Sequence, residues 1–196
     1  MILGDYDVDG TTSTSMLYTY FKHRHFEIIY YIPDRYKEGY GVSSKSIDYA
    51  KENNITLIIT VDCGIKAVNQ VEYANSKGID VIICDHHLPD IKVPKAYAIL
   101  NPKQSDCDYP FKDLCGCGIA YKLITAHNIK SDNKLNIHSL LDFVALATVS
   151  DMMPLIDENR VMVFHGLKEI NNNPRLGLGN FLKSNNNKVD ESKISF

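Results

Sequence analysis

The chain has 196 residues, of which 44% are hydrophobic and 23% charged, a composition typical of a soluble globular protein with one sizeable core. Its 21 Lys and Arg residues against 24 Asp and Glu residues give a net charge of −3, which excludes a strongly basic nucleic-acid-binding protein. No apolar run approaches the roughly 18 residues that span a membrane, and the start of the chain does not read as a secretory signal. We therefore expect a cytoplasmic protein with no membrane partner. The five cysteines include no C-x-x-C pair, which favours reduced, buried thiols over a zinc site.

Short apolar runs alternate with helical patterns through the first half of the chain. In chain order, the patterns predict a strand end at 1–3, a helix at 12–24, a strand at 26–32, a loop at 33–42, a helix at 44–53, a strand at 56–61, a helix at 66–77, a strand at 79–84 and a short strand at 97–100. Thr11 or Thr12 is the expected N-cap of the first helix. This alternation predicts βαβ units, and hence an α/β fold with an open, mainly parallel sheet and helices on both faces.

The second half reads as mainly helical. It contains an irregular loop at 103–115, a helix at 118–128, a helix at 137–149 that is apolar nearly all round, and a helix at 158–170. We expect residues 1–180 to form one domain whose first strand is incomplete, and residues 181–196, rich in Asn, Lys and Ser, to form a polar linker or tail.

Acidic and histidine side chains follow several of the apolar runs. In chain order they are Asp5, Asp7 and Asp9, then Asp62, then Asp85, His86 and His87, and finally Asp151. In a regular strand the first three would share one face. A single Asp after a strand is more often a helix cap, and a single His pair more often lies at the surface, so the joint pattern carries the inference. Because the carboxyl ends of parallel strands share one edge of a sheet, we expect these groups to meet there.

Mixed carboxylate and imidazole ligands suit Mn²⁺, with Mg²⁺ as the alternative, whereas Zn²⁺ more often recruits cysteine. Six or more ligands exceed what one ion with an open position needs. The pattern therefore favours two ions about 3.5–4 Å apart, the arrangement used for in-line attack on phosphorus. The ions would activate water and stabilise charge on the phosphoryl oxygens.

The same segments resemble the four motifs of the DHH phosphoesterases. The motifs are Asp5-Tyr6-Asp7-Val8-Asp9-Gly10, Val61-Asp62-Cys63-Gly64, Asp85-His86-His87 and Ser150-Asp151-Met152-Met153-Pro154-Leu155. Further segments are similar to the RecJ branch of this family, the single-strand-specific 5′→3′ DNA exonucleases, namely 32–41, Asn101-Pro102, 114–123 and Glu158-Asn159-Arg160. The resemblance covers residues 1–180. Leu3 occupies the position that holds a histidine in the pyrophosphatase-like branch, which argues against an inorganic pyrophosphatase.

The resemblance implies roles for individual residues. The implied metal ligands are Asp7, Asp9, Asp62, His86 and Asp151, with Asp5 as a further ligand or a residue behind the ligands. Asp62 would bridge the two ions, and His87 would face the scissile phosphate. The expected catalytic residues are Asp7, Asp9, Asp62, His86, His87 and Asp151. Among the basic and aromatic residues, Arg35, Tyr40 and Arg160 are candidates for substrate contacts, as are Lys37 and Lys122.

The expected function is metal-dependent, 5′→3′ hydrolysis of single-stranded DNA in DNA repair and recombination. We expect a monomer here, a second domain that closes the site to be absent, and single-strand-binding or recombination proteins to be partners of the full-length protein. One alternative is a nanoRNase or cyclic-dinucleotide phosphodiesterase of the same family, against which the loop Glu38-Gly39-Tyr40-Gly41 speaks. Another is a metal-free DHH-fold binding protein of a replication complex, against which the full set of acids and histidines speaks.

Overall fold

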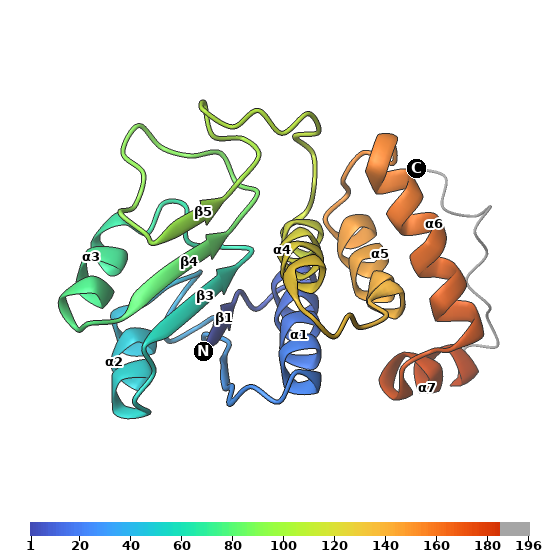
Figure 1. Ribbon diagram of the computed structural model, residues 1–196, viewed down its shortest axis with the longest axis horizontal. Coiled ribbons are helices and arrows are strands. Elements are labelled where there is room, and N and C mark those ends of the chain that lie inside the picture. Colours follow the sequence, from blue (N-terminus) through green and yellow to red (C-terminus); the bar gives the residue numbers. More distant parts are fainter. Residues whose placement is uncertain (185–196) are drawn as a thin grey trace.

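The first half of the chain forms a parallel β-sheet of five strands, in the order β2-β1-β3-β4-β5, which lies to one side of α1 and α4 (Figure 1). The computed structural model describes residues 1–184, and the side chains of residues 1–180. The strands are β1 (Ile2–Gly4), β2 (Tyr30–Tyr31), β3 (Leu57–Val61), β4 (Asp80–Cys84) and β5 (Ala98–Leu100). Every neighbouring pair is parallel. The α/β fold predicted from the sequence is therefore confirmed.

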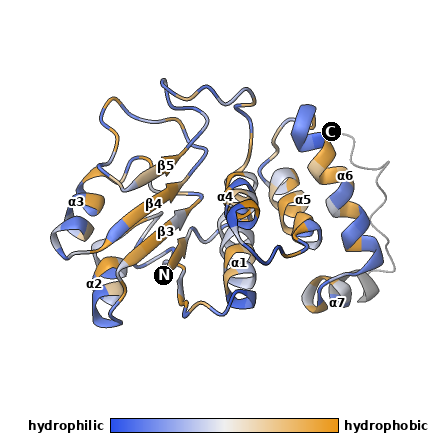
Figure 2. Cartoon of the chain, in the orientation of Figure 1, coloured by the Kyte–Doolittle hydropathy of each residue, from blue (hydrophilic) through white to orange (hydrophobic). Residues whose placement is uncertain are grey.

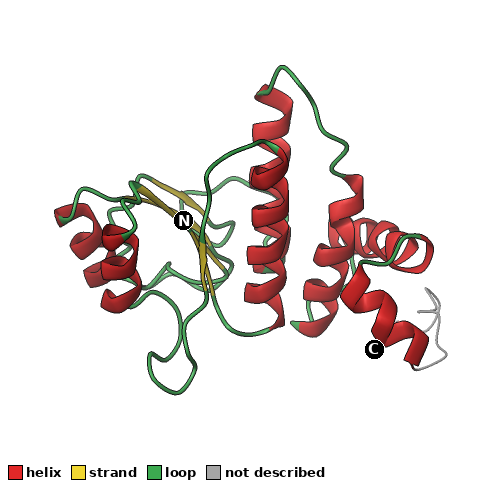
Figure 3. Ribbon diagram, turned by 90° about the horizontal axis from the view of Figure 1, so that it is seen from below, coloured by secondary structure: helices red, strands yellow, loops and turns green. Residues whose placement is uncertain are grey.

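Helices cover both faces of this sheet. They are α1 (Val8–His23), α2 (Ser44–Glu52), α3 (Val68–Ser76), α4 (Gly116–Lys130), the short 3₁₀-helix η1 (His138–Leu140), α5 (Leu141–Ser150), α6 (Asp157–Asn172) and α7 (Leu176–Ser184). Helices α2 and α3 lie on one face, and α1 and α4 on the other (Figure 3). Helix α5 packs against α1 and α4, and α6 packs against α5. Among the described residues, no helix is both long and apolar enough to cross a membrane.

Each face of the sheet has its own hydrophobic core. Neighbouring strand residues point to opposite faces, so Ile2 packs into the core with α1 and α4, whereas Leu3 packs into the core with α2 and α3. Figure 2 shows hydrophobic residues along β4 and α5, and hydrophilic and hydrophobic residues alternating along α6. This difference fits their positions, because α5 is enclosed between α1 and α6 while α6 has one outer face.

The first helix begins earlier than the sequence predicts. Asp7 is the N-cap, because its Oδ1 accepts a hydrogen bond of 2.9 Å from the backbone N–H of Gly10. Thr11 lies inside the helix, with its hydroxyl donating to the carbonyl oxygen of Asp7, so the predicted cap at Thr11 or Thr12 is wrong. The strand ends at Gly4, and Asp9 lies in the first turn of α1. Asp5, Asp7 and Asp9 therefore lie in the turn after β1 and at the start of α1, not on one face of a strand.

Three other segments differ from the predictions. The run 26–32 forms a strand only at β2, because β1, the strand it pairs with, offers three residues for pairing. The helix expected at 137–149 consists of η1 followed by α5. The tail expected from residue 181 overlaps the last turn of α7, and its remainder, 185–196, lies outside the described residues.

Helices α5 and α6 approach each other closely at Gly166. A Cβ atom there would lie 2.1 Å from the carbonyl oxygen of Leu141 and 2.6 Å from Cβ of Ala145. We expect Gly166→Ala to lower the free energy of unfolding by about 1–3 kcal/mol, the usual cost of overpacking, measured by urea denaturation. The control is Gly177→Ala in α7, where nothing lies within 4 Å; it should be neutral or slightly stabilising. Equal stability of the two variants would contradict the close packing.

Candidate metal centre

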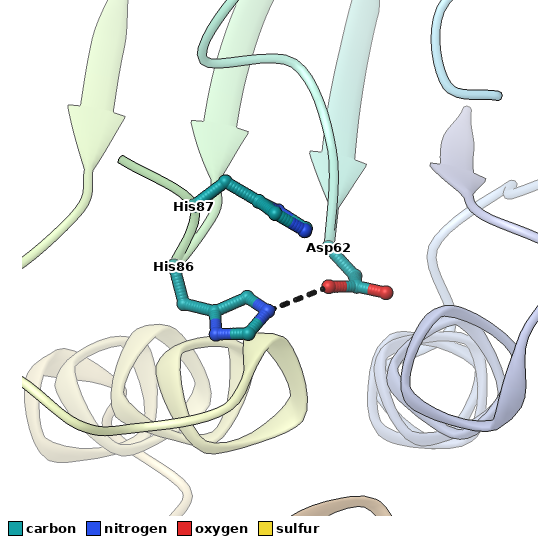
Figure 4. Close-up of side chains that lie close together, drawn as sticks. All are labelled: Asp62, His86 and His87. Atoms are coloured by element: carbon teal, nitrogen blue, oxygen red, sulfur yellow. Dashed lines mark ion pairs between the residues drawn. The ribbon is translucent and has the colours of Figure 1, made fainter. Parts of the chain in front are cut away.

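Acidic and histidine side chains meet at the carboxyl ends of β1, β3 and β4. The Nε2 atom of His86 lies 3.2 Å from Oδ1 of Asp62, 3.6 Å from Oδ2 of Asp151 and 3.8 Å from Oδ2 of Asp9. These four side chains come from the ends of β4, β3 and α5 and from the start of α1. Figure 4 shows the imidazole of His86 pointing at the carboxylate of Asp62, with His87 beside it.

All the residues that the sequence singles out as ligands belong to this cluster. Potential ligand atoms lie within 4.8 Å of one another in three overlapping groups: Asp9, His86 and Asp151; Asp62, His86 and His87; and Asp5, Asp7 and Asp62. Asp62 belongs to two of these groups and His86 to two, so both lie at the centre of the arrangement. Their roles as metal ligands stay a prediction.

The N-terminus of α4 holds the carboxylate of Asp9. The backbone N–H of Gly116 donates to Oδ2 at 2.6 Å, and that of Cys117 donates to Oδ1 at 2.7 Å. A Cβ atom on Gly116 would lie 2.7 Å from Cβ of Asp62, so a larger residue there would displace that aspartate. This helix begins at Gly116 rather than at residue 118, where the sequence pattern predicts it, so neither donor is predicted. The Gly116-Cys117-Gly118 stretch was the available signal, because helix N-termini bind carboxylates.

Asp62 has an unusual backbone conformation. Its φ angle of 57° lies in the left-handed region, which costs a residue other than glycine roughly 1–2 kcal/mol. Hydrogen bonds on both sides hold the peptide in place. The N–H of Asp62 donates to the carbonyl oxygen of Cys84 at 2.9 Å, and its own carbonyl oxygen accepts a bond of 2.7 Å from the hydroxyl of Tyr40.

Asp85 orients the ring of His87. Its Oδ1 lies 2.7 Å from Nδ1 of His87 and accepts a second bond from the backbone N–H of that residue. Its Oδ2 accepts a bond of 2.9 Å from the N–H of Ile65. Burial alone would raise the pKa of Asp85, but these hydrogen bonds hold it below the ordinary value. The hydrogen bond to Asp85 in turn raises the pKa of His87. The sequence predicts Asp85 at the sheet edge but gives no sign of this orienting role.

The cluster brings buried carboxyl groups, those of Asp9 and Asp62, close to one another. Burial, reinforced by Asp9 and Asp7, raises the pKa of Asp62 to about 11. Burial also raises the pKa of Asp9 to about 6, and it lowers that of His86 to about 4. Oδ1 of Asp62 and Nδ1 of His86 are buried without a hydrogen-bond partner. A divalent cation would offset the repulsion and occupy such carboxylate oxygens, so the residues fit a metal site.

The predicted substrate contacts Arg35, Tyr40 and Arg160 have different surroundings. The guanidinium of Arg35 lies over the ring of Tyr6, 5.2 Å from its centroid, and Tyr6 stands between Asp5 and Asp7 in the sequence. Tyr40 lies against the ring of His87. Arg160 instead lines a hollow on α6, together with Val161 and Phe164.

Two of the lysines proposed as phosphate contacts are engaged by carboxylates of the protein. Lys122, on α4, forms an ion pair with Glu158, on α6, and Lys37 lies 3.9 Å from Asp34. The side chains of Lys122 and Glu158 are 35% and 25% exposed, and their ion pair joins α4 to α6. Of the two, Lys37 is the more accessible to an anionic ligand.

Comparison with known proteins agrees with this architecture. The model of the DHH family, N-terminal domain, matches residues 1–148. The single-stranded-DNA-specific exonuclease RecJ of Bacillus subtilis is 43% identical over 192 residues, which is 98% of this chain and 24% of that protein. RecJ of Escherichia coli is 39% identical over 184 residues, covering 87% of this chain and 31% of that protein. The chain thus spans less than one-third of the length of these relatives.

Two solved structures have the same arrangement. A crystal structure of exonuclease RecJ bound to manganese matches the whole chain and 49% of its own chain, with a TM-score of 0.88 and 28% identity. RecJ of Thermus thermophilus in complex with Mn²⁺ matches 93% of this chain and 26% of its own, with a TM-score of 0.80 and 27% identity.

The raised pKa of Asp62 predicts a specific dependence of stability on pH. In the folded state this carboxyl keeps its proton up to about pH 11, whereas in the unfolded chain it loses the proton near pH 4. Between these values the folded state holds more protons, so the contribution of Asp62 to stability falls as pH rises. Asp62→Asn removes this contribution. In EDTA, we expect its stability relative to the wild type to increase by up to about 1.4 kcal/mol per pH unit.

Urea denaturation between pH 5 and pH 9 measures this difference. Asp80→Asn, at an exposed position in β4, is the control, and it should follow the wild type across the whole range. A stability difference between Asp62→Asn and the wild type that does not change with pH would contradict the raised pKa.

Proposed function

The chain belongs to the DHH family, and we propose that it is the catalytic part of a metal-dependent exonuclease that hydrolyses single-stranded DNA in the 5′→3′ direction. We propose that residues 1–180 form the catalytic domain and that the full-length protein acts in DNA repair and recombination. The names of the RecJ relatives support the substrate. Because the chain spans only 24% to 31% of those relatives, the activity of the whole protein is part of this proposal.

One observation carries the proposal. The carboxylates of Asp9, Asp62 and Asp151 surround a single imidazole nitrogen of His86 at 3.2–3.8 Å. They reach that point from separate segments of the chain, and each segment ends an apolar run. Neither a helix cap nor a surface turn requires such a convergence. Burial and mutual repulsion of these carboxylates, which raise the pKa of Asp62, cost stability that a bound cation would offset.

We propose two divalent ions, Mn²⁺ in the first place and Mg²⁺ as the alternative. The donor set of carboxylates and imidazole suits both, and the manganese-bound RecJ structures favour Mn²⁺. Asp62 is the candidate bridge, because it belongs both to the group with His86 and to the group with Asp5 and Asp7. When bound, the ions would supply an activated water and stabilise charge on the phosphoryl oxygens.

The protein itself contributes orientation. The two N–H groups at the start of α4 fix the carboxylate of Asp9, so it needs no reorganisation when substrate arrives. Asp85 fixes the ring plane of His87, which remains 43% exposed at its side chain and would face the phosphate. Arg35, whose guanidinium lies over the ring of Tyr6, is a candidate for a further phosphate contact. Tyr40 and Arg160 remain proposed substrate contacts.

We propose that the chain is a monomer and that single-strand-binding or recombination proteins contact the full-length protein. The alternative of a metal-free binding protein is disfavoured, because Asp9 and Asp62 would then be buried close to each other without a cation to offset their repulsion. The alternative of a dinucleotide phosphodiesterase is tested by comparing hydrolysis of single-stranded DNA with that of dinucleotides.

Binding of Mn²⁺ should stabilise the protein. A ligand at 100 times its dissociation constant adds about 2.7 kcal/mol, which for a chain of this size raises the melting temperature by about 5–10 °C. We expect this rise in millimolar MnCl₂ relative to EDTA, measured by differential scanning fluorimetry. Asp62→Asn should reduce the rise most, whereas Asp80→Asn should retain it. A melting temperature that does not change when Mn²⁺ is added would count against the metal site.

The chain alone should cleave single-stranded oligonucleotides slowly and only with Mn²⁺. Its net charge of −3 predicts weak, salt-sensitive binding, since affinity for single strands comes mainly from Lys and Arg. Asp151→Ala and His86→Ala should abolish the cleavage. Arg160→Ala should mainly weaken binding, and its effect should shrink as salt rises.

The matched control for these variants is Glu72→Ala, which removes an exposed carboxylate paired with Lys92 and should cleave like the wild type. Product release is followed on labelled oligonucleotides by gel electrophoresis. Cleavage that survives EDTA would show that the nuclease does not depend on the metal centre.

A further inference from the structure

The loop of residues 33–43, which joins β2 to α2, contacts the metal centre through two of its residues, Tyr40 and Gly41. The hydroxyl of Tyr40 donates to the carbonyl oxygen of Asp62 at 2.7 Å, and the Tyr40 ring meets the ring of His87 edge-on, with centroids 5.7 Å apart. The backbone N–H of Gly41 points at Oδ1 of Asp5, at 3.4 Å. The loop therefore supports three residues of the site, although it is remote from them in the sequence.

This conformation of the loop is not one that the backbone adopts by itself. Gly39 and Gly41 have φ angles of 80° and 77°, and they flank Tyr40. Glycine accepts these angles without strain, but it also loses the most conformational freedom when a loop becomes ordered. The contacts of Tyr40 and Gly41 offset part of this loss, and an interaction outside the Gly39-Tyr40-Gly41 stretch offsets more of it.

Glu38 supplies that interaction. Its side chain is only 6% exposed, and its carboxylate accepts hydrogen bonds from donors at both ends of the loop. The donors are the hydroxyl of Tyr31 at 2.6 Å, the hydroxyl of Ser43 at 3.1 Å, the backbone N–H of Asp34 at 3.2 Å and the ammonium of Lys45 at 3.4 Å. Tyr31 belongs to β2, and Ser43 is the N-cap of α2.

The carboxylate is ionised at neutral pH. Burial by itself would raise the pKa of Glu38, but the hydrogen bonds from Tyr31, Asp34 and Ser43 lower it below the ordinary value. Hydrogen bonds to a charged acceptor are about twice as strong as those between neutral groups. The single side chain therefore fastens the loop to the strand before it and the helix after it.

We propose that Glu38 is a positioning residue of the metal centre: by fastening the 33–43 loop, it keeps Tyr40 and Gly41 against Asp62, His87 and Asp5. Glu38 contacts none of these three site residues itself, so its influence passes through the loop. The backbone of Asp62 should respond most to a displacement of the loop. Its left-handed conformation is strained and persists only while its surroundings hold it, and the hydroxyl of Tyr40 is one of the groups that do so. The kinetic part of this inference rests on the proposed nuclease function, whereas the structural part does not.

The first experiment measures the order of the loop without any activity. Arg35 and Lys37 are exposed sites for trypsin within the loop. In Glu38→Ala, we expect cleavage after these residues to be at least about tenfold faster, because proteolysis follows the population of opened loop. Glu38→Gln retains the shape and an acceptor oxygen, so it should lie between Glu38→Ala and the wild type. Glu72→Ala, which removes an exposed carboxylate, should behave like the wild type.

The second experiment measures Mn²⁺-dependent cleavage of a labelled single-stranded oligonucleotide. We expect Glu38→Ala to lower kcat by about tenfold or more with a smaller change in KM, because a displacement of the reacting groups acts on the transition state. Tyr40→Phe should lower kcat as well, and the double variant should be no slower than the slower single variant, since both changes act through the same hydrogen bond to Asp62. Partial recovery of kcat in Glu38→Gln would match its partial protection from trypsin.

The two experiments separate failure of this inference from failure of the proposed function. Unchanged trypsin cleavage in Glu38→Ala, or effects of Glu38→Ala and Tyr40→Phe on kcat that simply add, would overturn the positioning role. A folded wild type without nuclease activity would overturn the proposed function, and the trypsin comparison would still decide whether Glu38 orders the loop. Circular dichroism identifies any variant that does not fold; if Glu38→Ala is one, Glu38→Gln carries both comparisons.

Discussion

Burial of like charge at one edge of the sheet is the constraint on which the rest of the structure depends. Asp9 and Asp62 are almost completely buried, although carboxylates are among the side chains that lose most on leaving water. The backbone supplies donors to the carboxylate of Asp9, whereas Oδ1 of Asp62 is buried without a hydrogen-bond partner. The N-terminus of α4 binds Asp9, and a bound cation would offset what repulsion remains.

The same constraint explains features of the fold that have no value for packing. Gly116 leaves room for the side chain of Asp62, and Gly10 does the same for the backbone of Asp5, whose nitrogen and carbonyl group would lie within 2.7 Å of an added Cβ. The positive φ angle of Asp62 turns the chain sharply after β3. Local strain and close approach therefore collect at the cluster, as expected where chemistry rather than stability selects the conformation.

Asp85 and Glu38 contribute to the cluster in similar ways. Each is a buried carboxylate that accepts several hydrogen bonds and has its pKa lowered by them. Asp85 fixes the ring of His87, and Glu38 fixes the loop that carries Tyr40. Neither has to bind a cation to do so. The protein thus uses carboxylates with lowered pKa values as supports, and carboxylates with raised pKa values, such as Asp62, as the candidate ligands.

The sequence by itself determined the parallel α/β fold and the gathering of the acids and histidines. Strand and helix periodicity fixed which segments alternate, and in a parallel sheet every strand presents its carboxyl end to the same edge. The motifs also determined the family. Only the tertiary structure decided how each side chain is held, because those contacts join residues far apart in the chain. Asp9 contacts Gly116, which lies 107 positions further along the chain, and Tyr40 contacts His87, which lies 47 positions further along. A local sequence pattern does not indicate which distant residues will come into contact.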